Sequence, residues 1–277
     1  MPELPEVEYG RKLCEQVGRG RSIVKARCEP DDIVYTGTTP QRVARALKGR
    51  TIEAVHRHGK YLWWELDTRP WPVFHFGMTG AFRARDVVPI ALARGPRADD
   101  TQWPPRFSKI LVELDDGAQL AMTNARRLGR IRLAKDPRAE PPLSRLGFDP
   151  LTQMPSPADF ARHLRRRKGV LKGLLLDQTF AAGVGNWIAD EVLYQARLDP
   201  RRTADSLDDR EVKALHRKLR SVVSKAVSVD ADKSRFPRTW LFHRRWGKQN
   251  DQRIGGHPIE HLEIGGRTTA WVPAVQR

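Results

Sequence analysis

The sequence predicts an α+β protein: an antiparallel β-sandwich with flanking helices at the N-terminus, a helical domain, and a C-terminal β-hairpin. Short β-branched and aromatic runs separated by turn residues fill residues 1–135. In residues 151–237, apolar residues recur every three or four positions, as on one face of a helix. Alternating residues on both sides of Gly265-Gly266 then predict a hairpin.

Two helices are expected beside the sandwich. Apolar residues spaced three or four apart between Pro5 and Val17, with Gly18 just beyond, predict the first helix. The second is expected to begin at Thr39-Pro40, which have the residue types of an N-cap and a first helical position, and to end before Gly49. Both helices are short and amphipathic, so each is expected to cover the sandwich with one face.

Six strands are expected in the N-terminal region, and Asp115-Asp116-Gly117 is a hairpin signal between two of them. Strands of this length joined by short turns are typical of an antiparallel sandwich or barrel. Their predicted spans are Thr51–Val55, Tyr61–Leu66, Val73–Met78, Ile110–Leu114, Gln119–Thr123 and Ile131–Leu133.

A proline-containing linker, residues 136–150, is expected to separate the N-terminal β-domain, residues 1–135, from the rest of the chain. The helical domain, residues 151–237, is expected to hold four helices, and the hairpin region, residues 238–277, follows it. A glycine-containing turn between the second and third helices gives a helix, turn, helix layout. The four helices are expected to begin near Ser156-Pro157, Val170, Trp187 and Asp208.

The composition favours a polyanionic partner. Fifty Lys and Arg residues against 33 Asp and Glu give a net charge of +17 and a pI of about 10.5. The hydrophobic fraction of 39% supports a folded core rather than a disordered basic tail. Nucleic acid is the first expectation for the partner, an anionic membrane surface is the second, and a general effect on solubility is the third.

The N-terminal sequence and the number of cysteines indicate the cellular compartment in which the protein is expected. No stretch approaches 18 consecutive apolar residues, and Met1 to Glu6 lack the basic and then apolar pattern of a secretory signal. Cys14 and Cys28 are the two cysteines, which argues against a disulfide framework and a four-cysteine zinc site. We therefore expect an intracellular protein, in the nucleus of a eukaryote or the cytoplasm and nucleoid of a bacterium.

Pro2 is the first candidate for chemistry. Removal of Met1 leaves Pro2 with a secondary amine, which in its neutral form attacks electrophilic carbons such as the anomeric carbon of a sugar. Glu3 and Glu6 carry carboxylates that can move protons beside that amine. The same residues also fit an ordinary helix start, and the short motif does not separate these two interpretations.

Basic or amide side chains recur at turns and helix starts, where they can reach phosphate groups. Each position alone also fits an ordinary surface charge or helix cap, so the pattern supports phosphate binding only when the positions are taken together. These positions are Lys60 in a turn between two strands, Arg130 and Arg132 on one strand face, Asn186 at a helix start and Arg267 beside a hairpin tip.

A series of motifs, in order along nearly the whole chain, resembles the formamidopyrimidine-DNA glycosylase family and its helix–two-turn–helix architecture. Leu4 in the opening motif resembles the oxidised-purine branch, since the endonuclease VIII branch usually has Gly there. The motifs are Met1 to Glu8, Gly59-Lys60, Phe76 to Gly80, Arg126-Arg127, Leu175 to Gln178, Gly183 to Glu191 and Gly266 to Ala270.

The resemblance implies a bifunctional DNA glycosylase and AP lyase of base excision repair. The Pro2 nitrogen would attack C1′ of the damaged nucleotide, the base would leave, and the iminium intermediate would allow β,δ-elimination that nicks the strand. Glu3 would shuttle protons at the sugar, and Glu6 would be a supporting buried carboxylate. Lys60 would position a flanking phosphate.

The resemblance also implies DNA-contacting residues. Met78, Arg126 and Leu128 match the trio that fills the hole left by a flipped nucleotide, and flipping is easiest for a poorly stacked lesion. Asn186 and Arg267 would clamp backbone phosphates. The expected substrates are oxidised purines, with formamidopyrimidines first and 8-oxoguanine and hydantoins as further candidates, in damaged double-stranded DNA that a monomer binds. No cofactor and no membrane contact are expected.

The sequence departs from the family pattern in three places. The family's finger commonly holds zinc with four cysteines, but no Cys follows Cys28, so this finger resembles the zincless variants of plant-type members. Leu128 stands where an aromatic wedge is usual, and Asn124-Ala125 replace Asp-Pro, which predicts weaker base stacking. Residues 229–237 are short where relatives carry a longer loop over 8-oxoguanine, which favours ring-opened and hydantoin purines.

Two alternatives stay open at this point. An endonuclease VIII-like enzyme would act on oxidised pyrimidines, and a non-catalytic binder would keep the basic surface without the chemistry. Comparing excision of thymine glycol with excision of formamidopyrimidine distinguishes an endonuclease VIII-like enzyme from an enzyme for oxidised purines. Binding of damaged DNA without strand cleavage would support a non-catalytic binder. The presence of Pro2, Glu3 and Lys60 favours an enzyme over a binder.

Overall fold

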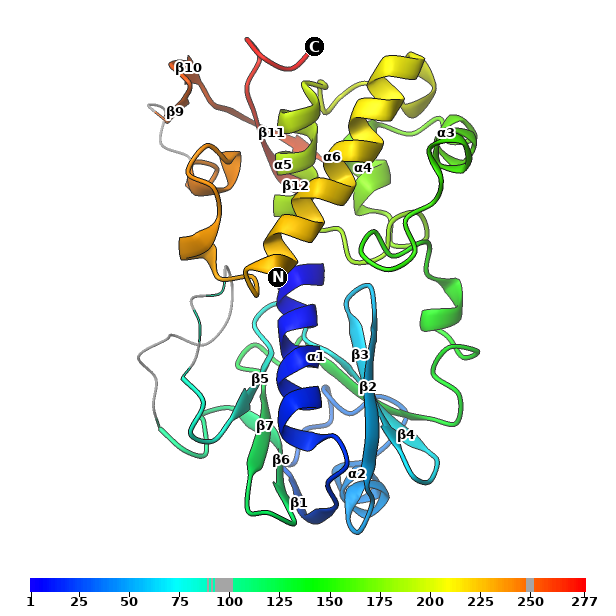
Figure 1. Cartoon of the computed structure of the whole chain (residues 1–277), viewed down its shortest axis with the longest axis vertical. Helices are drawn as coiled ribbons and strands as arrows, with labels where there is room; N and C mark the ends of the chain where they lie inside the picture. The colour runs from blue at the N-terminus through cyan, green and yellow to red at the C-terminus, as the bar shows by residue number, and fades with distance from the viewer. Residues whose placement is uncertain (89, 91, 93–101, 248–251) are drawn as a thin grey trace. The chain divides into compact units, whose positions relative to one another are not determined.

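The computed structural model describes residues 1–88, 90, 92, 102–247 and 252–277, and the chain divides into two compact units (Figure 1). The first comprises residues 1–145 and 230–234, and the second comprises residues 146–229 and 235–277. The first unit is a β-sandwich with two helices, and the second combines helices with short β-hairpins. The predicted α+β class is confirmed. No helix in the described part of the chain is long and apolar enough to cross a membrane.

The first unit is built from two four-stranded antiparallel sheets. One has the strand order β1-β6-β7-β5, and the other has the order β2-β3-β4-β8. Buried residues alternate with more exposed ones along β6 and β2, as expected for strands with one face on a core. The strands are β1 (Ile23–Cys28), β2 (Ile52–His58), β3 (Tyr61–Leu66), β4 (Trp71–His75), β5 (Ala81–Ala84), β6 (Ser108–Leu114), β7 (Gln119–Thr123) and β8 (Arg130–Ala134).

The strand predictions are confirmed most closely for β3 and β7, whose bounds are those expected. β1 and β5 were not predicted, because β1 is a mostly exposed edge strand and β5 has only four residues. The predicted strand Val73–Met78 was wrong at its end, since β4 stops at His75. The chain turns there because Gly77 has a φ of 61° and packs against the backbone of another loop.

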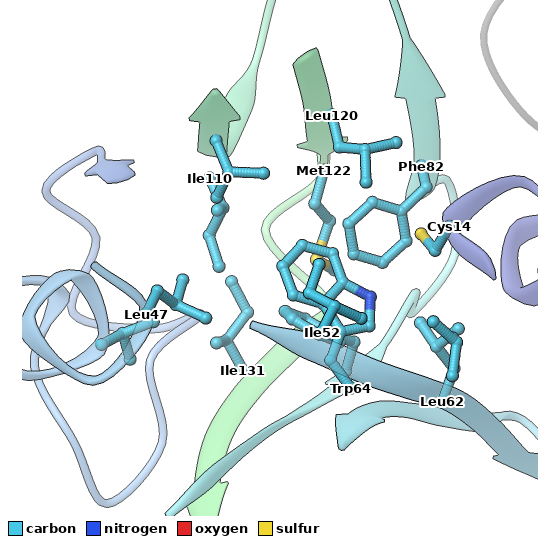
Figure 2. Close-up of a cluster of buried hydrophobic side chains, with 14 of the residues drawn as sticks. Cys14, Leu47, Ile52, Leu62, Trp64, Phe82, Ile110, Leu120, Met122 and Ile131 are labelled. Atoms are coloured by element: carbon cyan, nitrogen blue, oxygen red, sulfur yellow. The ribbon is translucent and has the colours of Figure 1, made fainter. Parts of the chain in front are cut away.

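Two helices cover the sandwich. α1 (Leu4–Gly18) packs against β2 and β5, which are edge strands of the two sheets, and α2 (Pro40–Leu47) packs against β1 and β4. α2 begins as predicted, with the Thr39 hydroxyl accepting the backbone N–H of Arg42. Figure 2 shows the core between the sheets. Its buried side chains include Cys14 from α1, Trp64 from β3 and Phe82 from β5.

The second unit contains the remaining helices. Ser156 and Asp208 cap α3 and α6 through their side chains, as their residue types predict. α4, a tight turn and α5 form the predicted helix, turn, helix layout. The helices are α3 (Pro157–Arg165), α4 (Leu171–Leu176), α5 (Asn186–Ala196) and α6 (Asp209–Ser228), with 3₁₀ turns along the chain at Leu143–Arg145, Ala204–Ser206, Lys233–Arg235 and Leu241–His243.

Two short antiparallel pairs complete the second unit. β9 (Arg253–Ile254) pairs with β10 (His257–Pro258), and β11 (Glu260–Ile264) pairs with β12 (Arg267–Trp271) across Gly265-Gly266. The second pair is the hairpin that the sequence predicts. A small apolar cluster that includes Leu241, Ile259 and Val272 packs beneath it.

Candidate active site

Pro2, Glu3 and Glu6 lie together at the buried N-terminal end of α1. Glu3 is the N-cap, and the two acids form a capping box in which Glu6 Oε2 accepts the backbone N–H of Glu3 at 2.9 Å. The cap fixes both carboxyl groups beside Pro2. The helix-start interpretation and the chemical one are therefore compatible, because the same side chains meet both requirements.

Glu6 differs from an ordinary surface acid in its protonation. Burial, followed by the negative charge of Glu3, raises the pKa of Glu6 to about 8. Glu6 is only 2% exposed, and its Oε1 has no hydrogen-bond partner among the described residues. At neutral pH Glu6 is therefore mostly protonated, and it can hold a proton one helical turn from Pro2.

Lys60 lies in the turn between β2 and β3 and is buried, unlike a solvated lysine at a hairpin tip. The buried guanidinium of Arg57 fixes this turn, since it donates to Glu8 Oε2 at 2.7 Å and to the carbonyl oxygen of Gly59 at 3.0 Å. Glu8 belongs to α1, as Glu6 does. This ion pair therefore ties the Lys60 turn to the helix that carries the N-terminal carboxyl groups.

Positive charge concentrates near the same turn. Burial, followed by the charges of Lys60, Arg130 and Arg132, lowers the pKa of His75 to about 4. Arg130 and Arg132 alternate with the buried Ile131 along β8, so they share a strand face as predicted. At neutral pH His75 is therefore uncharged, and the positive charge near this turn is that of Lys60, Arg130 and Arg132, which suits an anion such as a phosphate.

Met78, Arg126 and Leu128 are carried by two loops that touch. Met78 is half-buried in the turn after β4, while Arg126 and Leu128 are exposed in the loop between β7 and β8. A Cβ on Gly77 would lie 2.3 Å from the carbonyl carbon of Leu128, so the two backbones are in direct contact. The structure therefore brings together the three residues that the sequence motifs grouped.

The buried side chain of Asn124 holds these two loops together. Its Nδ2 donates to the carbonyl oxygen of Phe76 at 2.9 Å, and its Oδ1 accepts the backbone N–H of Gly129 at 3.1 Å. Sequence reasoning identified Asn124 only as a departure from the family's Asp-Pro. Its role depends on a partner 48 positions away, which no local pattern could have indicated.

Asp31 anchors the same loop from another side. Arg127, with a φ of 53°, donates to Asp31 and Asp32, and Lys109 of β6 lies 2.7 Å from Asp31. Burial would raise the pKa of Asp31, but the hydrogen bonds from Lys109 and Arg127 outweigh it and lower the pKa well below its usual range. Sequence reasoning missed this anchor as well.

Asn186 and Arg267 are close to each other in the second unit. Asn186 begins α5, and its Nδ2 donates to the carbonyl oxygen of Thr268 at 2.8 Å. Arg267 precedes that residue and is exposed at the hairpin, where it pairs with Ile264. The helix start and the hairpin arginine are thus joined by one hydrogen bond.

Buried acids of α5 hold the finger, the region of residues 238–277. Asp190 accepts from Lys172, from Arg245 at 2.5 and 3.0 Å, and from the backbone N–H of Ala270 at 3.2 Å. The neighbouring Glu191 accepts the backbone N–H of Phe242 at 2.8 Å. The two acids together fasten two finger segments to α5, the one that contains Phe242 and Arg245 and the strand that contains Ala270, as a metal centre does in other small folds.

The finger does not fit a four-cysteine zinc centre. Cys14 and Cys28 both lie in the first unit, and no cysteine follows them in the sequence. Within the described ranges no group of three or more His, Cys, Asp or Glu residues could hold a metal ion. The hairpin is shaped instead by strand pairing, the apolar cluster and Asp190.

Comparison with known proteins identifies the family. The formamidopyrimidine-DNA glycosylase N-terminal domain model matches residues 1–131, and the formamidopyrimidine-DNA glycosylase H2TH domain model matches residues 146–238. A formamidopyrimidine-DNA glycosylase of Arabidopsis thaliana is 43% identical over 277 residues, which are 100% of this chain and 71% of the relative. The chain belongs to the formamidopyrimidine-DNA glycosylase family. A relative from Heliobacterium modesticaldum is 36% identical and is matched over its full length.

Formamidopyrimidine-DNA glycosylases form a family of bifunctional glycosylases and AP lyases, so the enzyme class that the motifs indicated is confirmed. Solved structures of the same fold include a Lactococcus lactis FPG mutant with Fapy-dG containing DNA and MutM with carbocyclic 8-oxo-G containing DNA. Each has a TM-score of 0.80 and 25% identity, and the match covers 100% of both chains. Both neighbours are complexes with damaged DNA.

Proposed function

We propose that this chain excises oxidised purines from damaged double-stranded DNA and nicks the strand through a covalent intermediate on its N-terminal proline. The observation that carries the proposal is the cluster of Pro2, Glu3 and Glu6 at the buried start of α1, with the Lys60 turn tied to the same helix by Arg57. An amine nucleophile, two carboxyl groups, of which Glu6 is mostly protonated at neutral pH, and a phosphate-binding cation are the groups that this chemistry needs.

The reaction begins once removal of Met1 makes the Pro2 nitrogen a secondary amine. Its lone pair attacks C1′ of the damaged nucleotide, and the bond from C1′ to the base breaks with its electron pair leaving on the base. The amine gives its proton to the departing base. Glu3 then passes a proton to O4′ as the C1′–O4′ bond breaks, and the nitrogen lone pair forms the C=N bond of an iminium. Glu6, which holds a proton at neutral pH, can resupply Glu3.

The iminium makes the C2′ hydrogens acidic. Loss of one of them forms a double bond and expels the 3′ phosphate, and a further proton loss expels the 5′ phosphate, which is β,δ-elimination. Water then hydrolyses the iminium and restores the Pro2 amine. Lys60, near Arg130 and Arg132, holds a flanking phosphate during these steps.

The DNA-contacting roles follow the same geometry. Met78, Arg126 and Leu128 fill the hole left by the flipped nucleotide, since they project from two loops that Asn124 and Gly77 hold together. Asn186 and Arg267 clamp backbone phosphates in the second unit. The net charge of +17 and the likeness to complexes with damaged DNA support this assignment.

Lesion preference within the oxidised purines follows from two features. Leu4 supports the purine branch over the endonuclease VIII branch. Residues 229–237 form a compact segment in which Asp230 and Ala231 have positive φ and Lys233–Arg235 make one 3₁₀ turn. This short segment supports a preference for formamidopyrimidines and hydantoins over 8-oxoguanine, and the Arabidopsis relative together with the cysteine-free finger supports a zincless, plant-type member.

Borohydride trapping tests the covalent step. The full chain without Met1 should form a stable adduct with duplexes that carry a formamidopyrimidine or an abasic site, because borohydride reduces the iminium to an amine. Pro2→Ala should reduce the adduct at least about tenfold, and a chain that keeps Met1 should form none. An adduct formed by protein with a blocked N-terminus would contradict the proposal.

A panel of lesions tests the substrate. Duplexes with formamidopyrimidine, hydantoin, 8-oxoguanine and thymine glycol should be cut in that order of rate. Fastest excision of thymine glycol would place the chain with the endonuclease VIII branch, and tight binding of every lesion without cleavage would support a non-catalytic binder.

A further inference from the structure

An exposed aromatic residue stands outside the proposed DNA-contacting set. Phe107, directly before β6, is 54% exposed, and it is the one exposed phenylalanine or tryptophan in the part of the chain that the structure describes. Its φ is 60°, a left-handed conformation that bulky side chains rarely adopt. Burial in a core does not explain this conformation. Backbone strain of this kind concentrates at ligand-binding positions, which makes Phe107 a candidate.

Phe107 lies beside the loop that carries Arg126 and Leu128. Its carbonyl oxygen accepts the backbone N–H of Asn124 at 2.9 Å, and the side chain of Asn124 in turn closes that loop. Lys109, two residues further along the chain, and Arg127 of the loop both form ion pairs with Asp31. Phe107 is therefore continuous with the proposed DNA-contacting surface.

Basic side chains lie beside Phe107, and two of them are ion-paired, Arg27 with Glu29 and Lys109 with Asp31. The guanidinium carbon of Arg106 lies 5.1 Å from the centre of the Phe107 ring. A cleft of about 470 Å³ opens beside the ring and is lined in part by Arg27 and Lys109, and Glu29 of its lining is paired with Arg27 at 2.6 Å. An exposed ring with a guanidinium over it matches a nucleic acid strand, which offers planar bases between phosphates.

We propose that Phe107 is a stacking site for a nucleobase of the duplex next to the void left by the flipped nucleotide. This inference rests on the proposed function and extends it. Leu128 can wedge between bases, but it has no π face on which a base can stack. Phe107 supplies that face from the position directly before β6, so the aromatic contact comes from this neighbouring segment instead of from the loop.

Photo-crosslinking tests the contact directly. 5-Iodouracil replaces single bases opposite and beside a non-cleavable abasic analogue, and the full chain without Met1 is bound and irradiated. An iodouracil stacked on an aromatic ring crosslinks to that ring, so mass spectrometry should find Phe107 joined to DNA at one or two adjacent positions. A scan that gives crosslinks elsewhere on the protein and none at Phe107 would overturn the proposal.

Binding by variants gives the second measurement. Phe107→Ala and Phe107→Leu should both weaken binding of the abasic-analogue duplex about tenfold, because each removes a base-stacking surface, and Phe107→Trp should restore it. Val24→Ala is the matched control, since Val24 is 47% exposed at the opposite end of the same sheet, and it should bind as the wild type does. Thermal unfolding confirms that each variant is folded.

The outcomes separate this proposal from the proposed function. If Phe107→Leu binds as tightly as wild type, the aromatic face is not needed and the stacking site is wrong, while borohydride trapping by the wild type still supports the enzyme. If the wild type forms no borohydride adduct, the proposed function fails by itself, and a Phe107 crosslink would then describe a damage-binding protein.

Discussion

Glu3 and Glu6 lie one helical turn apart, and their surroundings give them different tasks. Glu6 is buried and close to a second acid, so its pKa rises to about 8 and it is mostly neutral at pH 7. Its Oε2 nevertheless accepts the backbone N–H of Glu3, so the cap forms without a charge. One residue thus stabilises a helix start and stores a proton for the proposed reaction.

Glu6→Gln should change the pH dependence of stability. Burial holds the folded-state pKa of Glu6 above its ordinary value of about 4.5, so the fold opposes ionisation, and wild-type stability is lost as the pH rises from about 4.5 to about 8. Glutamine does not ionise. Relative to wild type, the variant should gain unfolding free energy on the order of a few kcal/mol between about pH 5 and about pH 8. Denaturant titrations across this range measure the difference, and two parallel curves would contradict the assignment.

The loops after β4 and β7 behave as one element, although 48 residues separate Phe76 from Asn124. Glycine is required where they touch, because a side chain at Gly77 would overlap the backbone of Leu128. Asn124 then satisfies one backbone acceptor and one backbone donor, one on each loop. The positions of Met78, Arg126 and Leu128 therefore depend on a residue that contacts no substrate in the proposed mechanism.

Asn124→Ala should impair lesion excision more than it impairs cleavage at a preformed abasic site. The variant leaves the buried backbone N–H of Gly129 unpaired and removes the side-chain link between the loops, although the carbonyl oxygen of Phe76 keeps its hydrogen bond from Gly80. About 1–3 kcal/mol of stability should therefore be lost and the loops should separate. We expect kcat/KM for formamidopyrimidine to fall about tenfold, since the loop residues assist flipping, while an abasic site is flipped more easily. Single-turnover rates on both substrates provide the measurement.

Ile110→Val controls for stability in that experiment. It removes one methyl group from the core of the same unit, at a cost of about 0.5–1.5 kcal/mol, without touching either loop. It should leave the ratio of the two rates unchanged. An equal loss on both substrates for Asn124→Ala would show that the amide has only a structural role.

The whole molecule carries a net charge of +17, and each unit presents cations at the positions proposed to meet phosphates. Lys60, Arg130 and Arg132 surround His75 in the first unit. In the second unit, Arg267 extends from a hairpin that Asn186 and Asp190 fasten to α5. Fastening of the hairpin matters here, because backbone that is already ordered loses less entropy when its arginine binds a phosphate.

The salt dependence of DNA binding should reveal these contacts with phosphates. If about six phosphates are neutralised, the binding constant for an abasic-analogue duplex should fall with salt at a log–log slope of about −5. Arg267→Ala should reduce the magnitude of that slope by about one. Arg19→Ala, an exposed arginine paired with Glu15, is the control and should leave the slope unchanged. A slope near zero for the wild type would refute phosphate clamping.

The sequence by itself determined the features that depend on neighbours along the chain. Thr39 caps the helix that it was expected to cap, and Ser156 and Asp208 cap helices that were expected to begin at them, since a cap needs only the next three residues. The order of motifs from Met1 to Ala270 indicated the family for the same reason, because residue identity is enough to recognise it.

Tertiary structure alone decided which distant residues meet. The end of β4, the bracing amide of Asn124 and the anchor at Asp31 all depend on contacts between segments far apart, up to 96 positions for Asp31 and Arg127. Local periodicity records which face of an element is apolar, but not which loop lies against it. The exposure and the positive φ of Phe107 likewise could not be predicted from the sequence, because they depend on how the chain packs around this residue.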